Sequence, residues 1–151
     1  MSLLRTALRL DHLSAALRHV RDAEHLAGPD EPAHSLDQAY HLAGFGPECA
    51  RKAILSEATF DLAIGHGIGE ATEPGLKAAL ALDPGAHRYR ISGWEKRFPA
   101  LAKWTEQARY EKTGSRKGSE VKAVVEEARR VVDDVVLALW MDGRIPKDFT
   151  W

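Results

Sequence analysis

The sequence lacks most of what several protein classes require. Of its 151 residues only one is a cysteine, Cys49, which excludes a disulfide framework and a thiolate-rich zinc site. No apolar run is longer than the seven residues from Val135 to Met141, whereas a membrane-spanning helix needs about 20. A formal net charge of -1 argues against a protein that coats nucleic acid non-specifically. The first residues are too charged for a signal peptide, so we expect a cytoplasmic protein without membrane association.

Helical periodicity is the strongest positive signal. Two segments, one near each end of the sequence, have a single apolar stripe each, and residues 36–55 between them are apolar on most faces. Ser35 and Gln38 have the spacing of a capping box at the start of this middle segment. The first segment ends at Gly28-Pro29, before a polar linker at 30–34, and the last begins at Ser119. The first stripe contains Leu3, Ala7, Leu10, Leu13, Leu17 and Val20; the last contains Val121, Val124, Val125, Ala128, Val131, Val132, Val135 and Leu139.

The middle of the chain has weaker signals. Three glycines and Pro74 predict a loop over 58–74, followed by a helix over 75–82 and a turn at 83–85. A further helix is expected over 93–110, interrupted near Pro99, and then a basic loop over 112–118. No segment alternates with the period of a strand. We therefore predict an all-α fold, an antiparallel bundle of four to five helices in one domain, 1–151, with 36–55 as its most buried helix.

The seven histidines have no spacing typical of a metal site. The sequence contains no His-x-x-x-His, no His-Glu-x-x-His and no pair of Glu-x-x-His motifs, so we expect surface histidines and no metal or other cofactor. The segment 65–69, Gly-His-Gly-Ile-Gly, lacks the Gly-Lys-Ser/Thr ending of a phosphate loop and is interpreted as a flexible turn. Cys49 is interpreted as a core thiol.

Polar residues share one face of the second helix. Gln38, His41, Glu48 and Lys52 are separated by 3, 7 and 4 positions, and Glu48 and Lys52 have the favoured order of an i,i+4 ion pair. They form either a partly exposed stripe with a local salt bridge or the polar lining of a groove.

Cations and aromatic residues are interleaved in the second half of the chain. Cations bind phosphates and aromatic rings stack on bases, so these segments are candidates for nucleic-acid or nucleotide contact; the alternative is a solvated basic loop. The residues are Arg88, Tyr89, Arg90, Trp94, Lys96, Arg97 and Trp104, and then Arg109, Tyr110, Lys112, Arg116 and Lys117.

The segment 40–55, YHLAGFGPECARKAIL, resembles the signature of HEPN-domain proteins, in which an Ala-Gly-aromatic step precedes Glu-Cys-Ala-x-Lys in an early helix. The segment from Trp104 to Arg109-Tyr110 and the long last helix are also similar to that family. The resemblance implies a helical bundle, commonly a homodimer, with roles in RNA or nucleotide biology in prokaryotic toxin–antitoxin or defence systems.

Many HEPN ribonucleases use an Arg-x4-6-His motif near the end of the domain, but no histidine follows His87 here. Arg5 to His12 and Arg18 to His25 have the spacing only in the first helix, where we interpret them as chance matches. We therefore expect a non-catalytic HEPN-like domain that binds RNA, a nucleotide or a partner protein such as a nucleotidyltransferase antitoxin. The alternatives are a toxin endoribonuclease with a rearranged active site and a pure interaction protein. The candidate binding residues are His41, Glu48, Arg51, Lys52, Arg109 and Tyr110.

Overall fold

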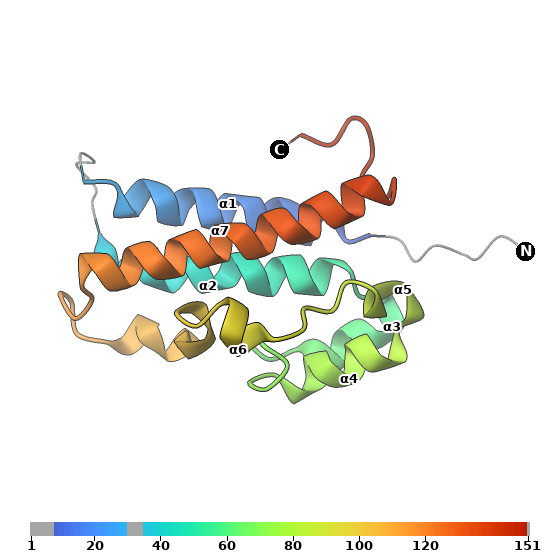
Figure 1. Ribbon diagram of the computed structural model, residues 1–151, viewed down its shortest axis with the longest axis horizontal. Helices are drawn as coiled ribbons and strands as arrows, with labels where there is room; N and C mark the ends of the chain where they lie inside the picture. Colours follow the sequence, from blue (N-terminus) through green and yellow to red (C-terminus); the bar gives the residue numbers. More distant parts are fainter. Residues whose placement is uncertain (1–7, 30–34, 151) are drawn as a thin grey trace, which may run out of the picture.

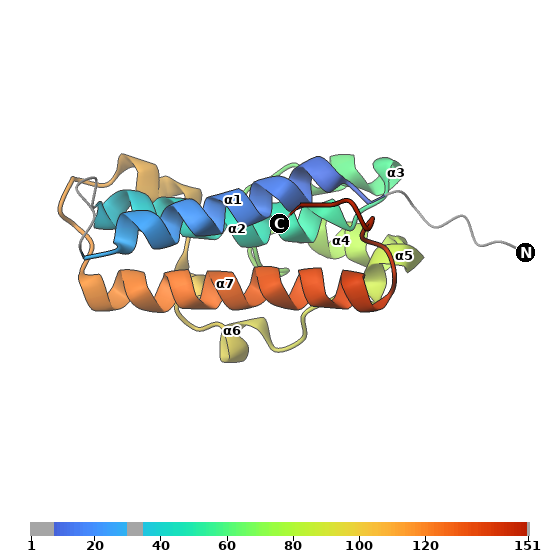
Figure 2. The same cartoon turned by 90° about the horizontal axis from the view of Figure 1, so that it is seen from above.

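Three long helices form the body of the molecule in the computed structural model, which describes residues 8–29 and 35–150 (Figure 1). Helices α1 (Leu10–Ala27) and α2 (Leu36–Ala53) pack together along their length, and α7 (Gly118–Met141) lies alongside both (Figure 2). The described residues contain no strand, which confirms the all-α class. Helix α1 is antiparallel to α2 and α7, so α2 and α7 run parallel, unlike neighbours in a fully antiparallel bundle.

The chain between α2 and α7 contains only short helices. They are α3 (Glu57–Phe60), η1 (Asp61–Ala63), α4 (Pro74–Leu82), α5 (Pro84–His87), α6 (Trp94–Arg97), η2 (Leu101–Lys103) and η3 (Glu106–Tyr110). The helix expected over 75–82 is confirmed as α4, and the turn expected at 83–85 includes the N-cap Asp83 of α5. The helix expected over 93–110 is three short pieces, because the chain bends there to bury Trp94, Phe98, Leu101 and Trp104.

The long helices bury the stripes that the sequence predicts. Every residue of the predicted α7 stripe is buried, as are Leu13, Leu17 and Val20 of α1, whereas Leu3, Ala7 and the linker at 30–34 lie outside the described residues. The Ser35 hydroxyl accepts a 3.3 Å hydrogen bond from the Gln38 amide, which confirms the predicted N-cap of α2.

Two glycines of α2 allow close packing on opposite sides. A Cβ atom at Gly44 would lie 2.0 Å from Cε2 of Trp104, and a Cβ atom at Gly46 would lie 2.4 Å from Cγ2 of Val20 in α1. The Trp104 indole nitrogen donates a 3.0 Å hydrogen bond to the Tyr40 carbonyl. Because these positions lack side chains, α2 contacts α1 on one side and the segment before η3 on the other.

A carboxylate of α7 holds the start of η2. Glu127 is buried, and its Oε2 accepts a 2.7 Å hydrogen bond from the amide of Leu101. A buried backbone donor without a partner is costly, so this bond helps to hold the 98–104 segment against α7.

Candidate functional site

The last turns of α2 contain three buried charged residues. Glu48, Arg51 and Lys52 are 7%, 2% and 7% exposed, and Lys52 Nζ lies 2.9 Å from Glu48 Oε1. This confirms the predicted i,i+4 ion pair. The pair is buried rather than part of an exposed stripe, because the 64–73 segment covers it.

The buried cations hold the 64–73 segment against α2. Lys52 donates to the Gly65 carbonyl and Arg51 donates to the Ile68 carbonyl. A Cβ atom at Gly65 would clash with the Glu73 carboxylate at 1.8 Å, and Ile68 is 1% exposed. The Gly-His-Gly-Ile-Gly segment is therefore irregular but packed, and its glycines allow close contacts where the sequence predicts a flexible turn.

His66 projects from this segment toward the buried pair. Its Nδ1 lies 3.2 Å from Glu48 Oε1, and its side chain is 49% exposed. With the proton on Nδ1, His66 donates to Glu48 and presents an unprotonated Nε2. The other carboxylate oxygen, Glu48 Oε2, is buried and has no hydrogen-bond partner among the described residues.

Three more histidines, from α1 and α2, lie near Phe45 or near Glu48. The His19 and His41 rings lie 5.6 and 4.9 Å from the Phe45 ring, and the His66 ring lies 6.2 Å from it. His12, one α1 heptad before His19, interacts electrostatically with Glu48. We call this surface the histidine face; its residues are His12, His19, His41, Phe45, Glu48 and His66.

Burial and neighbouring cations keep three of these histidines neutral near pH 7. The pKa values of His12, His19 and His41 lie below 6.5, first because of desolvation and second because of Arg9, Arg18 and Arg109 respectively. The Nδ1 atoms of His19 and His41 are buried without a hydrogen-bond partner among the described residues. The face thus combines neutral imidazoles with unsatisfied polar atoms.

The predicted basic segment reaches the edge of this face at Arg109. The charge of Arg109 contributes to the lowered pKa of His41, and its guanidinium lies 4.8 Å from the ring centre of the exposed Tyr110. Arg116 instead pairs with Glu111 and Glu120 and stacks on Tyr40 at 3.6 Å, so it stabilises the fold.

The structure brings together most of the predicted site residues. His41 and Glu48 belong to the histidine face, Lys52 lies beneath it, and Arg109 and Tyr110 lie at its edge. Arg51 is directed elsewhere, toward Glu70 and the Trp94 ring. Sequence analysis missed His12, His19, Phe45 and His66 as site residues; the seven-residue spacing of His12 and His19 was the only local signal.

The lone thiol is not activated. Desolvation raises the pKa of Cys49 to about 11, with the charge of Glu48 acting in the same direction, so the thiol is protonated at neutral pH. Cys49 is half-buried beside the histidine face rather than fully in the core.

Within 8–29 and 35–150, no three His, Cys, Asp or Glu side chains are arranged to hold a metal ion. None of the helices in the described part of the chain combines the length and apolar character needed to cross a bilayer. Comparison of the chain with protein-family models, curated proteins and solved structures finds no match.

Proposed function

We propose that the chain is a non-catalytic HEPN-like domain that binds RNA or a nucleotide at the histidine face. The observation that carries this proposal is the convergence of three histidines, His19 of α1, His41 of α2 and His66 of the 64–73 segment, around one half-buried aromatic ring, Phe45. Packing alone does not require three imidazoles around one ring, whereas recognition of bases and phosphates uses rings and hydrogen-bonding nitrogens together.

The chemistry of the face suits a nucleotide. Phe45 and the imidazole rings provide surfaces on which bases stack, and Arg109 provides a cation for a phosphate at the edge. Neutral imidazoles offer both a donor and an acceptor to the polar edges of a base.

Unsatisfied atoms support ligand binding at the same place. Glu48 Oε2 and the Nδ1 atoms of His19 and His41 are buried without hydrogen-bond partners among the described residues. Buried polar atoms of native proteins nearly always have a partner, so a ligand or an ordered water would satisfy them.

The HEPN resemblance supports a role in a prokaryotic toxin–antitoxin or defence system. In that role the domain is a homodimer, and a nucleotidyltransferase antitoxin is the partner protein we propose. Co-purification of the tagged chain with the product of the neighbouring gene, followed by a mass measurement in solution, tests both statements.

Fluorescence anisotropy with a labelled 12-nucleotide single-stranded RNA tests binding. We expect the double substitution His41→Ala/Arg109→Ala to weaken binding at least about tenfold, because it removes a stacking ring and a phosphate contact. The control His87→Ala/Lys122→Ala removes one histidine and one cation from exposed positions outside the face. Equal affinities of the two double variants would contradict the proposal.

A metal-independent endoribonuclease is the second candidate, favoured specifically by the pairing of His66 with Glu48 beside neutral histidines. A neutral imidazole removes a proton from the ribose 2′-hydroxyl, which attacks phosphorus, while a protonated imidazole gives its proton to the leaving 5′-oxygen. The neutral His12 is the candidate base, and His66, which in its protonated form pairs with the Glu48 carboxylate, is the candidate acid. His25 lies in the last turn of α1, at the opposite end of the helix from His12.

Incubation of total RNA with the protein in EDTA separates the two candidates. Cleavage that is lost in His66→Ala or His12→Ala and retained in His87→Ala would assign the enzyme. Binding without cleavage would assign the non-catalytic domain.

A further inference from the structure

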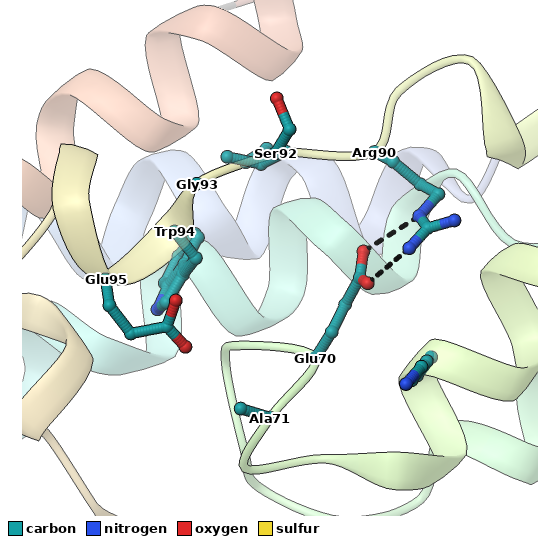
Figure 3. A pocket seen from close by; sticks show the side chains of 9 residues that line it. Glu70, Ala71, Arg90, Ser92, Gly93, Trp94 and Glu95 are labelled. Atoms are coloured by element: carbon teal, nitrogen blue, oxygen red, sulfur yellow. Dashed lines mark hydrogen bonds and ion pairs between the residues drawn. The ribbon is translucent and has the colours of Figure 1, made fainter.

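A second cluster of charges joins the 64–73 segment to the chain around Arg90 and Trp94. Arg51 is almost completely buried, and its distance to the Glu70 carboxylate, 3.5 Å, is long for an ion pair. Its guanidinium lies 5.0 Å from the centre of the Trp94 ring. Glu70 instead makes a close two-point pair with Arg90, from Nε to Oε1 at 3.1 Å and from Nη2 to Oε2 at 2.7 Å (Figure 3). One carboxylate is thus shared by two guanidinium groups.

A hollow of about 370 Å³ opens beside this carboxylate. Its lining includes Glu70, Lys77, Arg90, Trp94 and Glu95. The positive charge of Lys77 is one of the causes that lower the pKa of Glu70. Figure 3 shows Glu70 and Arg90 meeting on one side of the hollow, with Trp94 and Glu95 on the other. Two cations, Lys77 and Arg90, and two carboxylates, Glu70 and Glu95, therefore line the hollow, and a third cation, Arg51, contacts Glu70 from outside the lining.

We propose that this pocket binds a phosphate monoester and that Glu70 occupies the anion position when the ligand is absent. A phosphate dianion has more charge and more acceptor oxygens than a carboxylate, so it satisfies Arg90 and Lys77 better than Glu70 alone. Binding moves the Glu70 carboxylate aside, and the ester group of the ligand then occupies the hollow toward Trp94. This site does not depend on the RNA proposal, because it uses none of the residues of the histidine face.

The buried guanidinium supports the anion preference. Desolvation lowers the pKa of Arg51 to about 10, which still leaves it charged at neutral pH. Arg51 is hydrogen-bonded to the Ile68 carbonyl and paired with Glu70 at 3.5 Å, and its charge adds to the attraction of an anion near Glu70, where solvent screening is weak.

Phosphate binding is measured by NMR through the indole N–H signal of Trp94, which is identified by its loss in Trp94→Phe. Inorganic phosphate and glycerol 3-phosphate are the probes, and sodium chloride at equal ionic strength is the control. We expect saturable shifts in the unmodified protein, binding at least about tenfold tighter in Glu70→Gln, and binding at least about tenfold weaker in Arg90→Ala and Lys77→Ala. Lys122→Ala, an exposed change on α7, should leave the affinity unchanged.

Shifts that are the same with phosphate and with chloride, in the unmodified protein and in Glu70→Gln, would overturn the proposal. So would phosphate shifts that persist unchanged in Arg90→Ala. If Glu70→Gln does not fold, comparison of the unmodified protein with Arg90→Ala still decides the question, since Arg90 is an exposed residue.

Discussion

The indole ring of Trp104 occupies the place that a side chain at Gly44 would fill, with Cε2 only 2.0 Å from the position of the missing Cβ. Alanine at position 44 therefore displaces the ring and weakens its hydrogen bond to the Tyr40 carbonyl. We expect Gly44→Ala to lower the free energy of unfolding by about 1–3 kcal/mol, the usual cost of overpacking. Urea unfolding followed by tryptophan fluorescence measures it.

The matched control is Gly118→Ala at the start of α7, where a Cβ atom meets nothing within 4 Å. There alanine should leave stability unchanged or raise it by up to about 1 kcal/mol, because glycine is the poorer helix former. A similar loss of stability in both variants would show that the contact with Trp104 is not the reason for glycine at position 44.

Glu127 and Glu126 offer a second matched pair on α7. Glu127→Ala leaves the buried Leu101 amide without its acceptor, and we expect a loss of about 1–3 kcal/mol in the free energy of unfolding. Glu126 is exposed and lies 3.9 Å from Lys122, so Glu126→Ala should change stability by less than about 0.5 kcal/mol. Chemical denaturation of both variants provides the measurement, and equal losses would rule out the role given to Glu127.

The buried pair of Glu48 and Lys52 should show strong coupling. Lys52→Met leaves the buried Glu48 carboxylate with His66 as its one remaining hydrogen-bond partner among the described residues, and we expect a loss of about 3–5 kcal/mol. Adding Glu48→Gln removes the uncompensated charge and should restore much of that loss. A double-mutant cycle measured by denaturation checks this, and simple additivity of the two changes would contradict it.

Stability should decrease in mild acid because of the histidine face. His12, His19 and His41 have pKa values below 6.5 in the folded chain, mainly through desolvation, so the unfolded chain binds more protons as pH falls through about 6.5. We expect the melting temperature to fall between pH 7.5 and pH 5.5. Glu70 and Asp83, whose pKa values are also lowered, lose their contribution only in stronger acid.

Replacing the three histidines together with asparagine should flatten this dependence. Thermal melts of both proteins at pH 7.5, 6.5 and 5.5 make the comparison, with His87→Asn as the control. An unchanged slope in the triple variant would show that other groups cause the acid sensitivity.

RNA affinity should increase in mild acid, whereas stability decreases. A bound polyanion favours protonated imidazoles, so the proposed binding should tighten as pH falls from 8 to 6, provided that the fold is intact at each pH. Anisotropy titrations at constant ionic strength measure this, and the effect should disappear in the triple asparagine variant. Affinity that is independent of pH would place the RNA elsewhere.

The long helices were predictable because their signals are local. Val121 to Leu139 repeat with the period of a helix over several turns, and burial follows directly from that repeat. The segment between α2 and α7 has no such repeat: Trp94, Phe98, Leu101 and Trp104 are buried by the bends between them, and each bend depends on distant partners. The parallel direction of α2 and α7 depends on how that long connection returns, which periodicity does not specify.

The candidate site was only partly predictable for a related reason. Glu48 and Lys52 are four residues apart on one helix, so their pairing could be inferred from spacing alone. His19, His41 and His66 come from three separate elements, whereas a sequence motif relates residues within a single helix or loop. Helical spacing also does not distinguish Arg51 from Lys52, although the structure directs them to different neighbours.

The parallel arrangement of α2 and α7 has a consequence during synthesis. Helices α1 and α2 form a local hairpin that pairs as soon as both have left the ribosome, while the face that α7 will cover, including Gly46 opposite Val132, waits for the last quarter of the chain. We therefore expect a nascent chain arrested before α7 to carry an open apolar surface on α1 and α2.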